Sequence, residues 1–475
     1  MSKDFRIQRD SLGEVRVPSD RYYGAQTQRA VKNFPISGWR LPRRFIRAQG
    51  LIKAAAAHAN GVCGDLEEKV AAAIIQAAEE VIEGRWDEHF VVDVYQAGAG
   101  TSQNMNANEV IANRAARILG GEVGDTSLVH PNDHVNRGQS TNDTIHAAIN
   151  ISAAEELVHR LVPSLESLIE SLRKKEEEFG RIVKSGRTHL QDAVPLRVGQ
   201  ELSGYIGALE QARDGVKETL DLLCQIGLGG NAVGTGINTP AGYADEAVKE
   251  IARRTGLPFR QPKYRYAFMQ NTGAAIKASS ALKVLAVHLG KLASDLRLLS
   301  SGPRTGLAEY RLPAVQPGSS IMPGKVNPVM AEMMNMISVQ VIGNDAAITA
   351  AGEHAQLELN VLMPVIAHNL LHSINILTNG MDALRERCIE GLEVDEERCR
   401  SLMEQSLALA TALNPVIGYD KAAEVAKKAF REGKTVRQVI LEEKILTKEE
   451  AERVLDPDNL IPEDDGPAER NPFRR

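Results

Sequence analysis

Aromatic residues are scarce in this chain of 475 residues, where Phe, Trp and Tyr together account for 4% of the sequence. The core must therefore be built from Ala, Leu, Val and Ile, which suits closely packed helices better than a β-sandwich. The same scarcity leaves few side chains on which the bases of single-stranded nucleic acid could stack. The net charge of −6 also means that the chain has no overall positive charge with which to attract a nucleic-acid duplex or an anionic membrane.

Cysteine is also rare, and no two cysteines form the CxxC pair of a zinc ribbon or a redox centre. The four cysteines are Cys63, Cys224, Cys388 and Cys399. Isolated cysteines in a long chain predict reduced, mostly buried thiols and a cytoplasmic location. The sequence has no uncharged apolar run of about 18 residues and no apolar segment at its start. We therefore expect neither a membrane span nor a secretory signal.

Helical periodicity is what the sequence has in abundance. Apolar residues recur at helical spacing over long stretches, with Pro163 as an expected kink in the first of them. The five longest stretches are 145–172, 202–223, 282–299, a run that starts after Pro328, and about 357–384. A helix of about 30 residues spans about 45 Å, and several such helices favour a bundle. Apolar stripes this long also favour an oligomer, in which other chains pack alongside.

Shorter periodic segments predict further helices at about 43–60, 66–83 and 108–119. Proline and glycine punctuate the first forty residues, so this segment is expected to be irregular. After Gly391 the predicted helices become short and charged, at about 395–410, 419–431, 434–443 and 447–454. The Pro-rich, charged residues from Asp456 to Arg475 are expected to be disordered.

Two polar loops precede predicted helices and offer hydroxyl groups to a ligand. The first, Gly98–Asn106, carries Thr101 and Ser102 after glycines that let the backbone approach closely. The second runs from His130 to Asp143 and contains Ser140, Thr141 and Asn142. Uncharged donors at a helix N-terminus form a pocket for a carboxylate or a phosphate. The alternative is that each loop is simply a helix cap.

A third polar loop, Gly186–Asp192, contains the histidine that is best placed for acid–base work, His189. Pro195 is expected to start the helix that follows this loop. A lone histidine in a loop more often has no catalytic role. The presence of several similar polar loops in one chain favours a function for His189.

Two other pairs of histidines have the i, i+4 spacing of neighbours on a helix. His130 and His134 could be metal ligands, but no third ligand accompanies them, so no metal site is predicted. His368 and His372 lie on an apolar helix and are expected to be packed there.

The segment from Gly318 to Pro328 concentrates the most reactive side chains. Its glycines and prolines prevent a regular helix or strand, which is typical of a functional loop, although a polar surface loop is the alternative. A lysine beside an anion pocket can hold a carboxylate, and a serine can act as a base where its surroundings stabilise the alkoxide. The side chains concerned are Ser319, Ser320, Lys325 and Asn327. Glu332 could orient a histidine, but a solvated helix charge is the simpler interpretation.

Taken together, the four loops resemble those of the aspartase/class II fumarase superfamily, from about Arg6 to Leu460, and Gly318–Asn327 is the most specific match. The resemblance implies an all-α fold in three domains. These are an N-terminal helical domain of residues 1–141, a central long-helix bundle of residues 142–392 and a small C-terminal helical domain of residues 393–475. It also implies a homotetramer whose core is made by the central helices, with each active site collecting loops from three subunits.

The family chemistry is a reversible anti elimination of ammonia or water from a succinyl skeleton, which gives fumarate without a cofactor. The resemblance implies that Ser319 removes the proton next to the carboxylate and that His189 assists at the side of the leaving group. The doubly charged aci-carboxylate must be stabilised as it forms. The implied substrate-binding residues are Thr101, Ser140, Thr141, Asn142, Thr188, Ser320, Lys325 and Asn327. A secondary anion site is implied at His130, Asn132 and Asp133.

Details of the first two loops favour aspartate as the substrate. Both loops resemble the corresponding loops of aspartases, at Gly98–Ser102 and at Ser140–Asn142. Ala99 also lacks a hydroxyl that a hydratase can use near its substrate. The segment Thr411–Ala423 resembles fumarases instead, and Thr144–Ala147, which contains His146, departs from both groups. We therefore expect an aspartate ammonia-lyase, with fumarate hydratase as the first alternative. A lyase of N-substituted aspartates and a non-enzymatic, crystallin-like relative are further alternatives.

Overall fold

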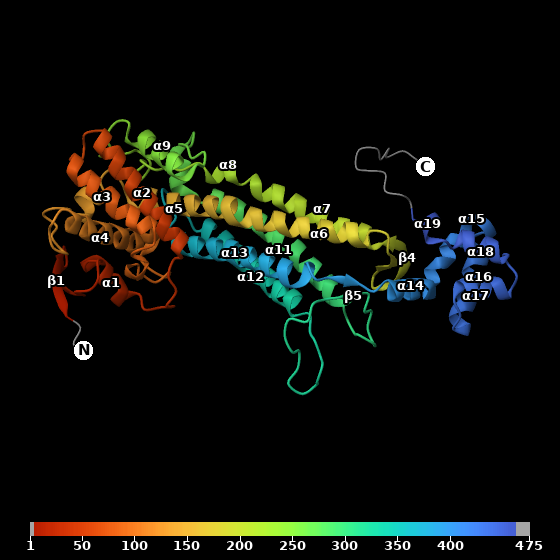
Figure 1. The fold of residues 1–475 in the computed structure, drawn as a ribbon. Helices are drawn as coiled ribbons and strands as arrows, with labels where there is room; N and C mark the ends of the chain where they lie inside the picture. Colours follow the sequence, from red (N-terminus) through yellow and green to blue (C-terminus); the bar gives the residue numbers. More distant parts are fainter. Residues whose placement is uncertain (1–3, 462–475) are drawn as a thin grey trace. The chain divides into compact units, whose positions relative to one another are not determined.

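The structure is a computed structural model that describes residues 4–461, and helices dominate it (Figure 1). The chain divides into two compact units. The first comprises residues 1–165, 211–287 and 336–380, and the second comprises residues 166–210, 288–335 and 381–475. The predicted all-α class is therefore confirmed, whereas the three-domain division at 1–141, 142–392 and 393–475 stays a prediction.

The first unit begins with an antiparallel hairpin of β1 (Phe5–Asp10) and β2 (Gly13–Pro18). Its helices are α1 (Ala25–Asn33), α2 (Arg43–Val62), α3 (Glu68–Ile82), α4 (Thr101–Ile118), α5 (Thr141–Glu156), α8 (Leu220–Leu223), α9 (Tyr243–Thr255) and α10 (Arg265–Gln270). Five longer helices have residues in both units. They are α6 (Val162–Phe179), α7 (Val198–Lys217), α11 (Gly273–Leu299), α12 (Val329–Glu353) and α13 (Met363–Leu384).

The second unit contains two short antiparallel pairs, β3 (Val183–Thr188) with β4 (Gln191–Arg197), and β5 (Tyr310–Arg311) with β6 (Glu393–Val394). Its remaining helices are α14 (Glu396–Gln405), α15 (Asn414–Ile417), α16 (Tyr419–Glu432), α17 (Val436–Glu442), α18 (Lys448–Val454) and α19 (Pro457–Leu460). The predicted short C-terminal helices and the run after Pro328 are thus confirmed. Within residues 4–461, no helix combines the length and the apolar character needed to cross a membrane.

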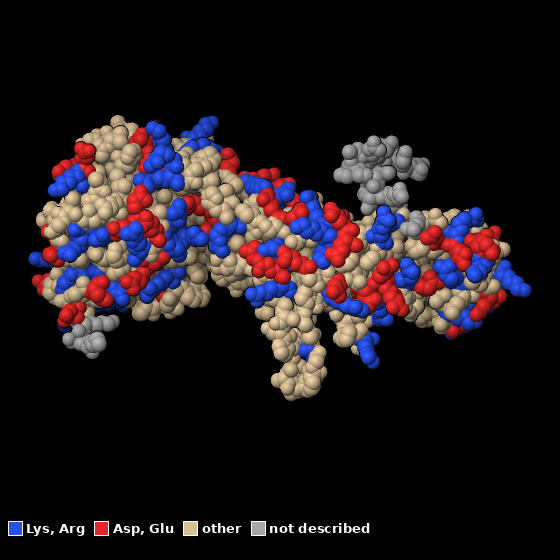
Figure 2. Space-filling model, viewed as in Figure 1, with Lys and Arg blue, Asp and Glu red and all other residues tan. Residues whose placement is uncertain are grey.

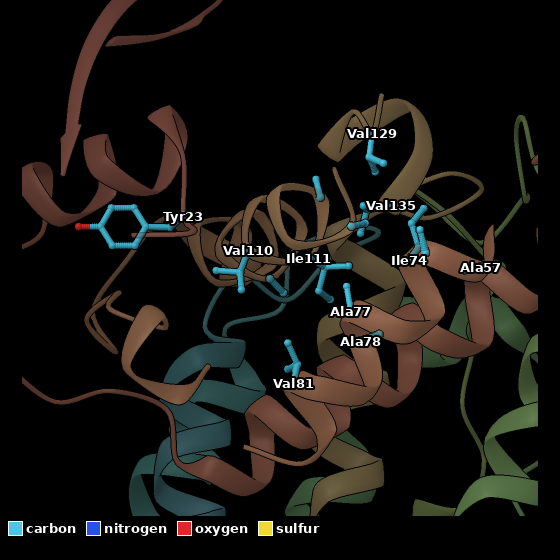
Figure 3. Packing of buried hydrophobic residues seen from close by; sticks show 14 of the residues in the cluster. Tyr23, Ala57, Ile74, Ala77, Ala78, Val81, Val110, Ile111, Val129 and Val135 are labelled. Carbon is cyan, nitrogen blue, oxygen red and sulfur yellow. The ribbon is translucent and has the colours of Figure 1, made fainter. Parts of the chain in front are cut away.

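Small and branched aliphatic side chains fill the core of the first unit, as the shortage of aromatic residues predicts. Figure 3 shows Ile74 and Val81 of α3 facing Val110 and Ile111 of α4. Between them lie alanines such as Ala77, which is fully buried. Because alanine occupies so little volume, the helix axes can approach closely, and the packing continues from α3 to α2.

The prediction for the first forty residues is wrong, since β1 and β2 pair there and α1 follows. Val15 and Val17 alternate with exposed residues on β2 and are buried, which is the period-two pattern of a half-buried strand. Gly13 has a φ of +112° at the start of β2, a conformation that side chains other than glycine rarely adopt. The glycine that suggested irregular structure therefore makes the turn of a hairpin.

The prediction that a helix begins near Asn108 is also wrong, because α4 begins at Thr101. Asparagines suggest a loop, yet Asn104, Asn106 and Asn108 are buried in α4. Their amides find partners in the fold; Asn106, for example, donates to the carbonyl of His89 at 2.9 Å. Tertiary hydrogen bonds here override the local preference of asparagine for turns.

Pro195 lies in a setting that differs from the expectation, whereas a helical irregularity accompanies Pro163 as expected. Pro195 does not start a helix; it lies in β4, opposite Ser185 and next to an irregularity in the register, where a strand tolerates proline. Pro163 is the second residue of α6, and the π-helical turn Leu157–Leu161 comes directly before that helix. Of the predicted disordered tail, residues 457–460 form α19, and residues 462–475 lie outside the described part of the chain.

We expect replacement of Ile111 by alanine to lower the free energy of unfolding by about 2 to 5 kcal/mol, because the side chain is fully buried and its loss leaves a cavity. Urea unfolding followed by circular dichroism measures the change. The matched control is Ile36→Ala, at a residue that is 64% exposed, for which a change within about 0.5 kcal/mol is expected. Equal effects of the two substitutions would contradict the assignment of this core.

Candidate active site

The predicted site residues fall into two groups, one in each unit. Thr101, Ser140, Thr141 and Asn142 belong to the first unit. The second unit holds Thr188, His189, Ser319, Ser320, Lys325, Asn327 and Glu332. Buried polar side chains adjoin the first group, and buried charged side chains lie at the base of the hairpin that carries Thr188 and His189.

Thr101 is the first residue of α4 and is exposed to solvent. A tight turn at Gly98–Gly100 precedes it, with φ values of +59° at Ala99 and +82° at Gly100. A Cβ at position 100 would lie 3.1 Å from Ile145 of α5, so glycine there lets the starts of α4 and α5 pack together. The amides of the first turn of α4 carry the positive end of the helix dipole, which favours an anionic ligand near Thr101.

Ser140 caps α5 and is held by a capping box. Its hydroxyl oxygen accepts a hydrogen bond from the N–H of Asn142 at 3.2 Å, and its own N–H donates to Asp143 at 2.9 Å. The other carboxylate oxygen of Asp143 accepts from the N–H groups of Gly229 at 3.0 Å and Asn231 at 2.9 Å. Burial raises the pKa of Asp143 to about 6, and these backbone donors oppose that rise.

A fully buried lysine, Lys53 of α2, lies behind this group. Its ammonium donates to Asn104 at 2.9 Å and to Asn136 and Gln139 at 3.0 Å each. The amide nitrogen of Asn104 in turn donates to the hydroxyl of Thr141 at 3.1 Å. Burial lowers the pKa of Lys53 to about 7, while the nearby Asp143 acts in the opposite direction.

The residues of the implied secondary anion site hold a local turn together, and their anion-binding role stays a prediction. His130 precedes the turn 131–135, and its Nδ1 accepts from the N–H groups of Asn132 at 3.3 Å and Asp133 at 3.1 Å. The backbone N–H of His130 donates to Nδ1 of His134 at 2.9 Å. His130 and Asn132 also line a cavity of about 600 Å³, to which Arg6 contributes. No cluster of three His, Cys, Asp or Glu side chains suited to a metal is present among residues 4–461.

In the second unit, Thr188 and His189 form the exposed tip of the β3–β4 hairpin. Thr188 pairs with Gln191, so His189 and Leu190 are the two residues of the turn, with φ values of +56° and +59°. Positive φ at both positions is the requirement of a type I′ turn, in which Asn and Gly are the usual residues. Two bulky side chains here are strained by about 1 to 3 kcal/mol each.

The base of that hairpin is anchored by buried charges. Lys184 of β3 lies 2.7 Å from Glu201 and 3.1 Å from Glu309, and both Lys184 and Glu309 are almost completely buried. Arg187 forms a bidentate pair with Glu309, at 2.9 and 3.0 Å. The hydroxyl of Tyr310 donates to Glu201 at 2.7 Å. A rigid base of this kind can hold a strained turn in place.

The loop between β5 and α12 carries Ser319, and Figure 2 shows that its surface is almost free of charge. Within residues 312–328 the single charged side chain is that of Lys325. The loop is closed at its neck, because Gly318 N–H donates to Lys325 O at 2.8 Å and the amide of Asn327 donates to Gly318 O at 2.9 Å. A Cβ at position 318 would lie 2.6 Å from that carbonyl oxygen of Lys325, so the neck requires glycine.

The hydroxyl oxygen of Ser319 accepts hydrogen bonds from the N–H groups of Ile321 at 3.2 Å and Met322 at 3.0 Å. Two backbone donors aimed at one oxygen stabilise negative charge on it. Ile321 is 82% exposed and Met322 48%, so the tip of the loop presents apolar side chains to solvent. Within residues 4–461, the side chain of Glu332 makes no hydrogen bond or ion pair, so its orienting role stays a prediction.

Comparison with known proteins identifies the family of the chain. Residues 13–343 match the family described as Lyase, and residues 409–462 match the family described as Fumarase C C-terminus. The chain belongs to the aspartase/class II fumarase superfamily. It is 51% identical over 460 residues to the class II fumarate hydratase of Halobacterium salinarum, and the match covers 97% of this chain and 98% of that relative.

Two further members of the superfamily show the range of activities and the fold. The chain is 47% identical over 455 residues to the aspartate ammonia-lyase of Bacillus subtilis, with 96% of each chain covered. The crystal structure of class II fumarase from Schistosoma mansoni superposes with a TM-score of 0.92 at 40% identity, and the match covers 96% of this chain and 98% of that one.

The expectation of an aspartate ammonia-lyase is wrong as the main interpretation. Relatives at 46–51% identity from several organisms carry the name class II fumarate hydratase. The details of the first loop that suggested aspartate are part of the packing at the start of α4. Ala99 is buried and donates its N–H to Val361 at 2.8 Å, and Ser102 is buried within the helix. Residues under such packing constraints are weak indicators of the substrate.

Sequence reasoning also missed Lys53, Asn104 and Asp143 as parts of the site. The available signal was a single lysine in the apolar, alanine-rich stretch that forms α2, together with the alternating asparagines of α4. A lysine on a helix normally projects into solvent, so the pattern alone does not distinguish a buried charge from an exposed one.

His146 of α5 is buried, and neither of its ring nitrogens has a hydrogen-bond partner. Burial lowers its pKa to about 4 from an ordinary 6.5. Between those values the unfolded chain binds a proton that the folded chain excludes, so stability falls as the pH falls from 6.5 towards 4.

His368 and His372, by contrast, are packed as expected. The ring of His368 stacks on that of Trp39, with 5.0 Å between the ring centroids, and on that of His372.

We expect His146→Leu to remove about 2 kcal/mol of the stability that the protein loses between about pH 7 and about pH 5. Denaturant unfolding at the two pH values measures this difference. The matched control is His159→Leu, at an exposed histidine of the turn 157–161, which should keep the pH dependence of the parent. An unchanged pH dependence in the His146 variant would show that this side chain is not buried in its neutral form.

Proposed function

We propose that the chain is a class II fumarate hydratase, which interconverts L-malate with fumarate and water. The observation that carries the proposal is the 51% identity to a fumarate hydratase along almost the whole of both chains. The reactive loop supports the same chemistry, because Ser319 accepts two backbone hydrogen bonds that suit an alkoxide base.

In the proposed reaction, Ser319 takes a proton from the carbon next to one carboxylate of L-malate. The electron pair of that C–H bond moves into the carboxylate and gives an aci-carboxylate with two negative charges. The intermediate then expels hydroxide from the neighbouring carbon as the double bond of fumarate forms, and a proton delivered at the side of His189 makes the leaving group water. Lys325 and the donors at the starts of α4 and α5 would offset the developing charge.

We expect Ser319→Ala to lower kcat for L-malate by about 10²- to 10⁴-fold, because the base is lost while the fold is retained. The increase in fumarate absorbance after addition of L-malate measures the rate. The matched control is Ser203→Ala on α7, whose hydroxyl bonds the carbonyl of Gln200 in its own helix and should be dispensable.

Wild-type protein should produce fumarate from L-malate and should not do so from L-aspartate in the same assay. Production from L-aspartate in place of L-malate would contradict the proposed function. A Ser319→Ala variant with nearly full malate activity would instead contradict the assignment of the base.

We further propose that the protein is a homotetramer in which three subunits contribute to each active site. Exposed apolar side chains on two long helices support an assembly. On α12 these are Met336, Val339 and Ile342, which recur every three residues, and on α11 they are Val284 and Val287. All five lie in the first unit and are 42–70% exposed in the single chain. A stripe of this kind is typical of a surface that another chain covers.

We expect Val339→Glu to dissociate the oligomer, since it introduces a charge into the apolar stripe of α12. Light scattering coupled to gel filtration measures the mass, against 51.7 kDa for one chain. Val62→Glu, at a valine that is 63% exposed at the end of α2, is the matched control and should leave the assembly intact. A wild-type mass near that of one chain would contradict the tetramer.

A further inference from the structure

The hydrogen bonds around Lys53 determine the direction in which every amide of this buried network points. A protonated lysine carries three donors and no acceptor, so its three neighbours must each present an oxygen. Those neighbours are the amide oxygens of Asn104, Asn136 and Gln139. The side-chain amides of asparagine and glutamine have two distinct ends, and fixing the oxygen end fixes the nitrogen end as well.

Contacts away from the lysine give the same orientation independently. The amide nitrogen of Gln139 faces the backbone carbonyls of Val135 at 3.0 Å and Arg137 at 3.1 Å, which can only accept. The amide nitrogen of Asn136 likewise faces the carbonyl of Gln139 at 3.2 Å. The oxygen ends of both side chains must therefore point towards Lys53.

Asn104 takes its orientation from the same pair. Its amide nitrogen lies 3.3 Å from the oxygen of Asn136 and 3.1 Å from the hydroxyl oxygen of Thr141. Because the Asn136 oxygen can only accept, the group of Asn104 that faces it must be the donor. The same NH₂ then donates to Thr141, and the oxygen of Asn104 faces the ammonium.

These contacts determine that the hydroxyl of Thr141 accepts from Asn104 and can donate only elsewhere. Its oxygen already accepts from Asn104, so its own proton is available for an acceptor outside the network. Thr141 lies in the first turn of α5, beside the cap residue Ser140, where an anionic ligand is favoured. A substrate carboxylate can only accept, and it therefore matches a hydroxyl that is held as a donor.

We propose that Lys53 and Asn104 are positioning residues that form a directional relay, Lys53 to Asn104 to Thr141, which commits the Thr141 hydroxyl to donate to a substrate carboxylate. The proposal rests on the proposed function, in which Thr141 contacts the dicarboxylate. Neither Lys53 nor Asn104 needs to touch the substrate. Because Asn104 presents a donor to Thr141, the Thr141 hydroxyl cannot donate its proton to Asn104 and keeps it for the substrate.

Reversing the polarity of the relay tests it. Asn104→Asp keeps the shape of the side chain but replaces the donor by an acceptor, so the Thr141 hydroxyl would donate inward. We expect kcat/KM for L-malate to fall about 10- to 100-fold, the value of a hydrogen bond to a charged group. In a Thr141→Val background, which has no hydroxyl to redirect, the same substitution should lower kcat/KM by less than about threefold.

A Thr141→Ser background is the matched control. Serine retains the hydroxyl, so Asn104→Asp should again lower kcat/KM by about 10- to 100-fold. A substitution that merely disturbed the fold would lower activity by the same factor in all three backgrounds. That result would overturn the relay, and so would a Thr141→Val variant with the kcat/KM of the wild type.

Lys53→Met provides a second route if the Asn104→Asp chain does not fold. It removes the ammonium at similar volume and leaves Asn104 held by Asn136, Thr141 and Thr144 alone. The amide of Asn104 is then less firmly oriented, so we expect a smaller fall in kcat/KM that again depends on the Thr141 hydroxyl. Failure of wild-type protein to convert L-malate would contradict the proposed function. Conversion by the wild type with equal factors in all backgrounds would contradict only the relay.

Discussion

The need to provide hydrogen-bond partners for one buried amine organises the polar interior of the first unit. Lys53 has no access to water, so its ammonium must be bonded within the protein or the fold is destabilised by several kcal/mol. Its three acceptors come from α4 and from the turn before α5, while Lys53 itself belongs to α2. These bonds therefore connect α2, α4 and the turn before α5. Thr101 is the first residue of α4, and the turn leads directly into Ser140 and Thr141.

The second unit follows the same plan with different groups. Lys184, Glu201 and Glu309 form a buried charged cluster at the base of the β3–β4 hairpin, and Arg187 extends it towards the exposed tip. The Ser319 loop is closed at its neck by backbone and amide hydrogen bonds. The contacts at the base of the hairpin are buried, whereas those at the neck of the Ser319 loop are only partly buried. Both sets of contacts fix the base of a loop whose tip stays exposed.

The sequence was sufficient for the helices whose apolar face repeats without interruption, such as α2, α3 and α12, because periodicity reports burial directly. It was insufficient where polar residues are buried. The asparagines of α4 predicted a loop, and Lys53 was not predicted to belong to the site, because the partners of these side chains are distant in sequence. The prediction of aspartate as the substrate was wrong for a related reason. Ala99 is constrained by its backbone hydrogen bond to Val361, so the residue type at this position is a weak indicator of the substrate.

The capping box of Ser140 has a consequence for the entropy of binding. A serine on a flexible loop must give up its rotational freedom when it meets a ligand, and that loss weakens association. Here the Asn142 N–H already holds the hydroxyl of Ser140 in one rotamer before any ligand arrives. The ordering of this side chain is therefore part of the folding of α5, and it adds no further entropic cost when a ligand contacts the hydroxyl.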